Sequence, residues 1–242
     1  MASRQIVPRV YEVSLGFVNA FLIDADGLTL IDTGVAGSTG KILGAVRALG
    51  RQPQDIRHIL VTHCHADHTG SLSELKAATG APAYMHPVDA EMVRAGRATR
   101  PMRPGPGIFN HLLFRLFMAR RRAAPTTIQP TSIEREVQDG EELPIAGGIR
   151  AIHTPGHTAG HLSFYWPHQG GVLFVGDAAA HMFGLGYAPF YEDIQQGQQS
   201  LARLAGRDFA VACFGHGKAL IGGAAARFRR KWPVAARAAV KA

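Results

Sequence analysis

Short apolar runs alternate along the chain with longer segments in which apolar side chains recur every three or four residues. The short runs predict buried strands, and the longer segments predict amphipathic helices. Glycine marks several breaks between runs, as at Gly16 and at Asp26–Gly27, where tight turns are expected. The predicted strands cover Val7–Ser14, Asn19–Ile23, Leu28–Ile31, His58–Val61, Ala83–Met85, Ile149–His153, Leu162–Trp166, Val172–Val175 and Phe209–Cys213.

The predicted helices fall between these strands in both halves of the chain. Ser38 stands where an N-cap would begin the first of them. Arg97–Pro106 is rich in proline and glycine and predicts a loop. Because strands and helices interleave, we expect an α/β fold with two sheets covered by helices. The helices are predicted at Ser38–Leu49, Ser71–Thr79, Pro87–Ala95, Ile108–Arg122, Ile194–Ala205 and after Gly217.

The composition is that of a folded globular protein. Apolar residues make up 46% of the 242 positions and charged residues 18%, which is unlike a disordered chain. No linker divides the sequence, so we expect a single domain over residues 1–242, with a basic, apolar helical insertion at about 96–130. No apolar run reaches the roughly 18 residues of a membrane span. The absence of a secretory signal pattern and the presence of only two cysteines favour a cytoplasmic protein.

A dense group of potential metal ligands follows the strand predicted at His58–Val61. The sequence Thr-His-Cys-His-Ala-Asp-His places His63, His65, Asp67 and His68 within six residues. His63 and His65 are two positions apart at a strand end, so their side chains project to the same side. Imidazole and carboxylate ligands together suit zinc, iron or manganese. The cluster therefore predicts part of a metal site.

Three more polar residues stand at the ends of later strands, each beside glycine. They are His157 in Thr-Pro-Gly-His, Asp177 in Val-Gly-Asp and His216 in Gly-His-Gly. Glycine allows the backbone to approach a metal closely. Together with the first cluster, these residues make seven candidate ligands.

The motifs and their order resemble those of the metallo-β-lactamase-fold hydrolase superfamily. The resemblance covers nearly the whole chain, from Asp32-Thr33-Gly34 to Gly215-His216-Gly217. It implies a four-layer αββα sandwich with two divalent metal ions at one edge of the two sheets. Zinc is favoured, and iron or manganese would suit the same ligands. By position, it implies one ion on His63, His65 and His157, the other on Asp67, His68 and His216, and a bridge between them at Asp177.

The implied reaction is hydrolysis of a carbonyl or phosphoryl ester by a hydroxide that bridges the two ions. Asp67 and Asp177 supply negative charge that offsets the repulsion between two dications. Asp67 is also a candidate to pass a proton to the leaving group. The resemblance implies that Asp32 orients ligands from outside the metal sphere, although it could instead cap the Thr33–Gly34 turn. Cys64 is expected to point away from the ligands.

The substrate is less closely defined than the reaction. The pattern is most similar to N-acyl-homoserine lactonase-like enzymes, which open an ester ring and bind an acyl chain in an apolar groove. Glyoxalase II-like thioesterases share the seven ligands, whereas β-lactamases usually have Cys or Ser at the position of Asp177. A phosphodiesterase or nuclease is a further alternative. A metal-stabilised scaffold without activity would predict losses among the ligands, and none is lost.

Two tyrosines are further catalytic candidates. Some lactonases carry a tyrosine three residues after the bridging aspartate, and here that position is Ala180. Tyr187 and Tyr191, in the segment 181–193, could supply the phenol or could simply pack.

The net charge of +8 is distributed unevenly. Eight arginines and no acidic residue lie between Arg94 and Arg122, and the segment from Lys218 to Ala242 also lacks acids. Because Ile108–Met118 is mostly apolar, nucleic acid is a disfavoured partner. We interpret the arginines as a clue to an anionic or amphiphilic small substrate, or to solubility. Ile108–Arg122 is expected to be either a lid over the site or a packing helix, which could form a homodimer.

Overall fold

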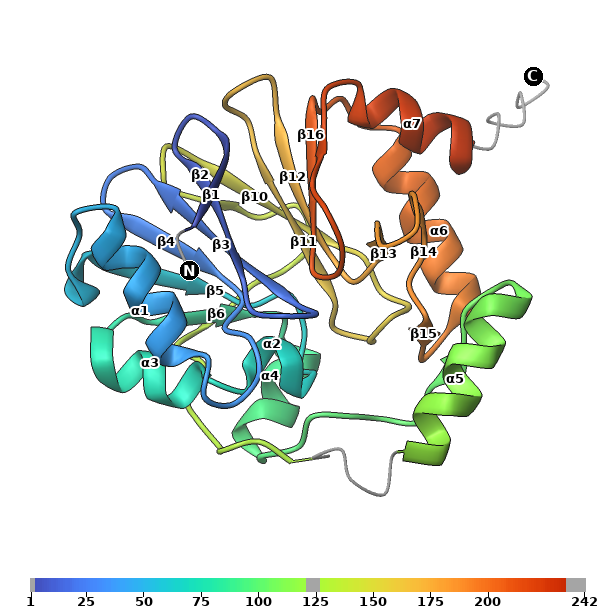
Figure 1. Cartoon of the computed structure of the whole chain (residues 1–242), viewed down its shortest axis with the longest axis horizontal. Helices are drawn as coiled ribbons and strands as arrows, with labels where there is room; N and C mark the ends of the chain where they lie inside the picture. Colours follow the sequence, from blue (N-terminus) through green and yellow to red (C-terminus); the bar gives the residue numbers. More distant parts are fainter. Residues whose placement is uncertain (1–2, 121–126, 234–242) are drawn as a thin grey trace, which may run out of the picture.

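Two β-sheets pack face to face in the computed structural model, which describes residues 3–120 and 127–233 (Figure 1). Within these residues the first sheet has the strand order β1-β2-β3-β4-β5-β6-β8, and the second has the order β17-β16-β12-β11-β10-β9. The first sheet contains β1 (Arg4–Val7), β2 (Val10–Ser14), β3 (Asn19–Asp24), β4 (Leu28–Ile31), β5 (Ile56–Leu60), β6 (Ala83–Met85) and β8 (Arg135–Glu136). The second contains β9 (Glu142–Leu143), β10 (Ile149–His153), β11 (Leu162–Trp166), β12 (Val172–Gly176), β16 (Val211–Phe214) and β17 (Leu220–Ile221).

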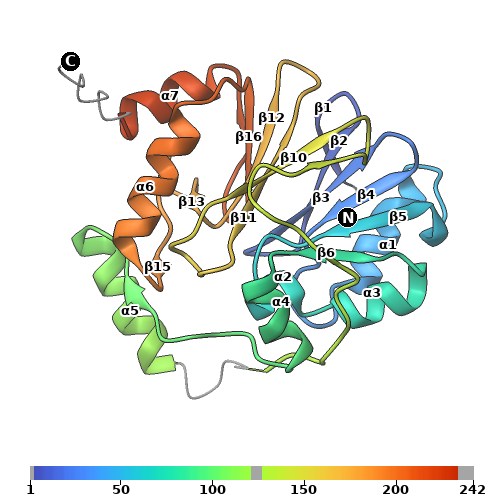
Figure 2. The ribbon, with the colours of Figure 1, turned by 180° about the vertical axis from the view of Figure 1, so that it is seen from behind.

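Helices cover the outer faces of both sheets, as the two opposite views show (Figures 1 and 2). The first sheet is covered by α1 (Thr39–Ala48), α3 (Leu72–Thr79) and α4 (Pro87–Arg94), and the second by α6 (Ile194–Ala205) and α7 (Ala224–Lys231). A single turn of helix, α2 (Ala66–Thr69), follows β5. In the described parts of the chain, no helix is long and apolar enough to cross a membrane.

The apolar side chains form three layers because successive residues of a strand point to opposite faces. In β3, Ala20 and Leu22 pack toward the helices, whereas Phe21 and Ile23 pack between the two sheets. In β12, Leu173 points outward into the layer beneath α6 and α7. The order of layers is therefore helix, sheet, sheet, helix, which confirms the αββα sandwich expected from the sequence.

The sheet topology brings several loops to one edge of the sandwich. β4 and β5 run parallel in the first sheet, and β12 and β16 run parallel in the second. β10 also runs parallel to β12, because each pairs antiparallel with β11. Loops that leave the carboxyl ends of parallel strands meet at the same edge. The candidate ligands lie in these loops.

The predicted insertion contains one long helix and one short strand. α5 (Ile108–Arg120) projects beside α6 (Figure 1), and β7 (Arg103–Pro104) pairs with β15 (Phe190–Tyr191). The prediction of a loop over Arg97–Pro106 is therefore wrong at β7, where partners distant in sequence supply the strand pairing. The predicted helix residues Arg121 and Arg122 lie outside the described residues.

Two local predictions are corrected by the structure. Ser38 occupies the N-cap position of α1, but its side chain makes no capping hydrogen bond. Instead, the Ser38 N–H donates to Ser71 Oγ over 2.8 Å, so a neighbouring loop holds the start of the helix. The strand predicted at Val7–Ser14 is two strands, because the chain turns at Arg9, whose φ is +69°.

Candidate metal centre

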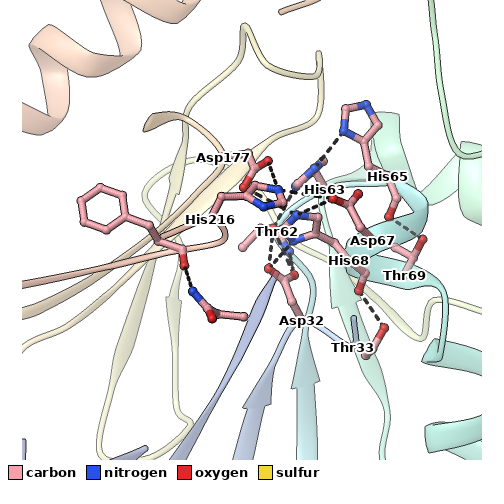
Figure 3. Close-up of polar contacts among 12 residues, drawn as sticks. Asp32, Thr33, Thr62, His63, His65, Asp67, His68, Thr69, Asp177 and His216 are labelled. Carbon is pink, nitrogen blue, oxygen red and sulfur yellow. Dashed lines mark hydrogen bonds and ion pairs between the residues drawn. The ribbon is translucent and has the colours of Figure 1, made fainter. Parts of the chain in front are cut away.

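The seven candidate ligands come together at the edge where the parallel strands end. Figure 3 labels all of them except His157. The loop after β5 carries the first cluster, and the loops after β10, β12 and β16 carry the others. Residues as far apart in sequence as His65 and His157 therefore lie in direct contact. The ligand atoms fall into two groups.

The first group consists of three histidines whose ring nitrogens face one point. His65 Nδ1 lies 3.1 Å from His63 Nε2 and 3.0 Å from His157 Nε2. All three side chains are buried. This arrangement offers three nitrogen ligands, which is the number that catalytic zinc sites use while keeping a fourth position open.

The second group combines histidines with carboxylates. His216 Nε2 lies 3.3 Å from Asp67 Oδ2 and 3.1 Å from Asp177 Oδ2. His68 Nε2 lies 3.5 Å from Asp177 Oδ1. Asp177 also reaches the first group, since its Oδ2 lies 3.5 Å from His157 Nε2. One carboxylate thus stands between the two groups.

Hydrogen bonds on the far side of each ring fix which nitrogen carries the proton. His157 Nδ1 lies 2.7 Å from the Phe190 carbonyl, and His216 Nδ1 lies 2.7 Å from the Phe17 carbonyl. A carbonyl only accepts, so each Nδ1 must donate and each neutral ring presents a lone pair at Nε2. Such bonds are the usual means by which proteins orient metal-binding histidines.

Asp32 performs the same task for His68. Its Oδ2 accepts a hydrogen bond from His68 Nδ1 over 2.8 Å, and its Oδ1 accepts from the Thr62 N–H over 2.8 Å. Asp32 has a φ of +61°, an uncommon conformation for a residue with a side chain. Its carboxylate is directed to Thr62 and His68 and not to the Thr33–Gly34 turn. The structure therefore favours the ligand-orienting interpretation over the turn cap.

The chemistry of this donor set fits a pair of cations. The buried atoms His68 Nε2 and Asp177 Oδ1 have no hydrogen-bond partner among the described residues. The ring nitrogens His65 Nδ1, His63 Nε2 and His157 Nε2 face one another at hydrogen-bond distance. Neutral rings do not carry enough protons for each of these nitrogens to take part in its own hydrogen bond. Leaving buried polar atoms unsatisfied is costly, and a metal ion would satisfy them.

The electrostatics of the two groups differ. Burial, with His157 beside it, lowers the pKa of His65 to about 3, so this ring stays neutral with its lone pair available. Burial also opposes charge on His216, but the carboxylates of Asp177 and Asp67 outweigh it and raise the pKa of His216 to about 10. The second group of ligands, which contains the carboxylates, therefore favours a positive charge. The first group supplies neutral nitrogen donors.

Residues 13–216 match the model of the metallo-beta-lactamase superfamily. The chain belongs to this superfamily. Its members are metal-dependent hydrolases, and the histidine-rich site described above is a candidate for their metal site.

Known relatives agree with this assignment. The chain is 25% identical over 231 residues to the probable metallo-hydrolase YflN of Bacillus subtilis, covering 88% of this chain and 85% of YflN. It is 32% identical over 152 residues to the hydroxyacylglutathione hydrolase of Rhodospirillum rubrum, covering 62% of this chain and 42% of that enzyme. The chain spans less than two thirds of the length of the first curated relatives that it matches. A solved metallo-beta-lactamase of Cronobacter sakazakii superposes with a TM-score of 0.70 at 25% identity, covering 89% of this chain and 80% of that one.

A large cavity opens above the candidate metal site. Its volume is about 880 Å³, and Asp67, Asp177 and His216 lie at its base. Leu113 and Phe114 of α5 form part of its wall. The helix that was expected to be either a lid or a packing helix therefore contributes to the cavity wall. The wall is mostly apolar, which is typical of a site for a small organic molecule.

None of the five described arginine side chains from Arg94 to Arg115 lines this cavity. Where the structure describes the lining, it contains no lysine or arginine, and Glu74 adds a carboxylate to the wall. Three of these arginines pair with acids elsewhere: Arg94 with Glu136, Arg97 with Glu91, and Arg100 with Asp89. Their interpretation as a clue to an anionic substrate therefore gains no support from the cavity lining.

Neither tyrosine candidate lines the cavity within the described residues. Tyr191 is fully buried, and its hydroxyl donates to the Ala178 carbonyl over 2.8 Å and accepts from the Ala188 N–H over 3.0 Å. Burial raises the pKa of Tyr191 well above its usual value. Tyr187 packs edge-on against Trp232. The geometry of both side chains is that of packing.

Several residues that support the ligands carry no obvious sequence signal. His161 accepts the Asp177 N–H at its Nε2 over 2.9 Å and lies against Thr154 Oγ1 at its Nδ1. His153 and His181 bond to backbone carbonyls and belong to neither ligand group. Asp89 was missed entirely, although it is fully buried beside two of the ligand loops. A lone aspartate in a helix resembles a solvated residue until its partners are known.

Proposed function

We propose that this chain is a dinuclear metal-dependent hydrolase that cleaves a carboxylic ester or lactone, with an N-acyl-homoserine lactone-like substrate favoured. His63, His65 and His157 would hold one divalent ion, and Asp67, His68 and His216 the other, with Asp177 between them. The observation that carries the proposal is that two sets of ligand atoms meet at one shared carboxylate, with buried atoms left unpaired. Zinc is the favoured metal, and iron or manganese would suit the same donors.

When bound, the two ions would supply a water activated near neutral pH and polarise the bond under attack. Asp67 lines the cavity, and its side chain is 25% exposed. Burial opposes its charge, but His68 and His216 lower the pKa of Asp67 below its usual range. Asp67 therefore stays charged near neutral pH. A carboxylate with a lowered pKa holds a proton only briefly, so its proposed role is to relay a proton from the attacking water to the leaving oxygen and not to store it.

The cavity favours a neutral substrate with an apolar group. Its wall is mostly apolar, and Glu74 is the one acidic side chain among its described lining residues outside the candidate ligands. A glutathione thioester and a β-lactam both carry carboxylates, and a phosphodiester carries a negative charge. Away from the proposed ions, no lysine or arginine among the described lining residues would bind these anionic groups, and Glu74 would repel one placed beside it. An ester or lactone with an acyl chain avoids this repulsion.

Thioester hydrolysis is the second candidate, because several relatives are named hydroxyacylglutathione hydrolases and one is named a thioesterase. A hydrolysis panel separates the candidates. It would contain acyl-homoserine lactones, neutral aryl esters, S-lactoylglutathione, a cephalosporin and a bis-aryl phosphodiester, each assayed with zinc-loaded protein. We expect kcat/KM to be highest for a lactone or neutral ester. Activity confined to S-lactoylglutathione or to the phosphodiester would contradict the substrate assignment.

A further inference from the structure

Asp89 is a fully buried carboxylate outside both ligand groups. It lies in the first turn of α4, where the helix dipole favours a negative charge. An isolated buried carboxylate is very unfavourable and is retained only where partners satisfy it. Asp89 has four such partners, and their identity suggests its role.

Two of the partners belong to the loops that carry the histidine group. Asp89 Oδ2 accepts from the Cys64 N–H over 3.1 Å and from Thr158 Oγ1 over 2.6 Å. Cys64 stands between His63 and His65, and Thr158 directly follows His157. One oxygen therefore links the backbone between two of the histidines to the residue beside the third.

The loop after β10 also packs directly on this carboxylate. Asp89 Oδ1 accepts from the Gly160 N–H over 3.2 Å. A Cβ at position 160 would lie 2.7 Å from the carboxylate carbon, so only glycine allows this approach. The loop cannot shift away from Asp89 without breaking contacts at both oxygens.

Arg100 and Glu192 complete the network from the outside. Arg100 Nη1 donates to Asp89 Oδ1 over 2.8 Å and to Glu192 Oε1 over 3.2 Å. Glu192 Oε2 accepts from the Ala159 N–H over 2.8 Å. The charge of Asp89 is therefore balanced, and the same loop is held at a second point.

The second ligand group, which contains the carboxylates, is held in place by other residues. His68 is held by Asp32, His216 by the Phe17 carbonyl, and the Asp177 backbone by His161. None of these contacts involves Asp89. A perturbation at Asp89 should therefore act on one half of the site.

We propose that Asp89 is a positioning residue that sets the spacing of His63, His65 and His157, and so tunes the affinity of the three-histidine half of the site for its metal. This inference rests on the proposed dinuclear site. Arg100, which also bonds to Glu192, holds the Asp89 carboxylate in place. Removal of supporting partners of metal ligands typically costs about 10- to 100-fold in metal affinity.

The test is a Co²⁺ titration of the metal-free full chain, followed by the visible absorption of the bound ion, for the wild type, Asp89→Asn and Thr158→Val. The wild type should bind two ions. Asp89→Asn should weaken one binding step about 10- to 100-fold and change its absorption band, while the other step keeps its affinity. Thr158→Val removes one hydrogen bond without disturbing the buried charge, and should shift the same step by less.

Asp139→Asn is the matched control. Asp139 also accepts a backbone N–H, from His153, and pairs with Arg203. These contacts do not include His63, His65 or His157 or the residues next to them. The inference would be overturned if Asp89→Asn weakened both Co²⁺-binding steps equally, or if Thr158→Val left the affinity of both steps unchanged. If Asp89→Asn fails to fold, Thr158→Val decides alone. A wild type that binds no metal would instead refute the proposed function.

Discussion

Asp177 joins the two halves of the site through a single side chain. Its Oδ1 faces His68, and its Oδ2 faces His157 and His216. The histidines around it are locked in place by bonds from their other ring nitrogens, so their lone pairs point inward without further adjustment. His65 differs, because its Nδ1 faces His63 and His157, whereas its outer nitrogen, Nε2, is buried without a hydrogen-bond partner in the described structure. No hydrogen bond from its other ring nitrogen therefore fixes the orientation of this ring.

Replacing His65 with alanine should abolish hydrolysis and leave the fold largely intact. The substitution removes one of three nitrogen ligands, while the three apolar layers do not contain this side chain. The measurements are the hydrolysis rate and the thermal midpoint. His168→Ala, at an exposed histidine away from the site, is the control. Activity within about tenfold of the wild type would show that His65 does not hold a catalytic ion, because losing a ligand to the reactive centre should cost far more.

Replacing Tyr191 with phenylalanine should affect stability and not chemistry. The hydroxyl bonds to two backbone groups in a buried setting, and leaving such groups unpaired costs about 1–3 kcal/mol. We expect a lower free energy of unfolding in a denaturant titration and a kcat close to that of the wild type. Tyr187→Phe should change neither quantity appreciably. A large fall in kcat for Tyr191→Phe at unchanged stability would indicate that its phenol takes part in catalysis.

At the scale of elements, α5 presents apolar residues on two faces. Leu113 and Phe114 contribute to the cavity wall, whereas Leu112 and Leu116 are 56% and 51% exposed. Residues one position apart on a helix point in different directions, so this helix offers its own internal control. The inner face can contact a substrate, and the outer face cannot.

Alanine substitution of Leu113 and Phe114 should therefore raise KM for long-chain esters more than for short-chain esters. A contact made by a remote acyl chain contributes binding energy of about 0.8 kcal/mol for each buried methylene, so the difference should grow with chain length. The measurement is kcat and KM across a series of acyl lengths. The double variant Leu112→Ala and Leu116→Ala should leave the series unchanged. Equal effects from the two double variants would argue that α5 acts only through folding.

A histidine pair between α4 and β10 should make stability depend on pH. The rings of His86 and His153 stack with centroids 4.2 Å apart. Burial, and then His153, lower the pKa of His86 below 6.5, although Asp89, Asp139 and Glu136 oppose this shift. Since the unfolded chain takes up this proton first, stability should be lost as the pH falls below 6.5. Urea-unfolding midpoints at about pH 5 and 8 would measure the loss, and His86→Gln should reduce it. A midpoint that rises on acidification would contradict the sign.

At the scale of the whole molecule, the sequence predicts features formed by residues that are close in sequence, and it misses contacts between residues that are far apart in sequence. The first cluster could be recognised because His63 to His68 occupy one turn after a strand. Two sheets covered by helices could be expected because predicted strands and helices interleave, and the αββα order of the layers was implied by the family resemblance. The network around Asp89 could not be predicted, because Asp89 and Gly160 are 71 positions apart and neither has a distinctive neighbour. Arg97 and Arg100 look like any other arginines in the sequence, yet they pair with Glu91 and Asp89, and neither lines the cavity.

The central claim is that the two ligand groups hold two metal ions. The most direct test is the metal content of the folded chain after purification and supplementation with zinc, measured by elemental analysis against protein concentration. The account predicts close to two ions per chain, since two groups of donors share one carboxylate. A folded chain that contains no metal after supplementation would contradict it.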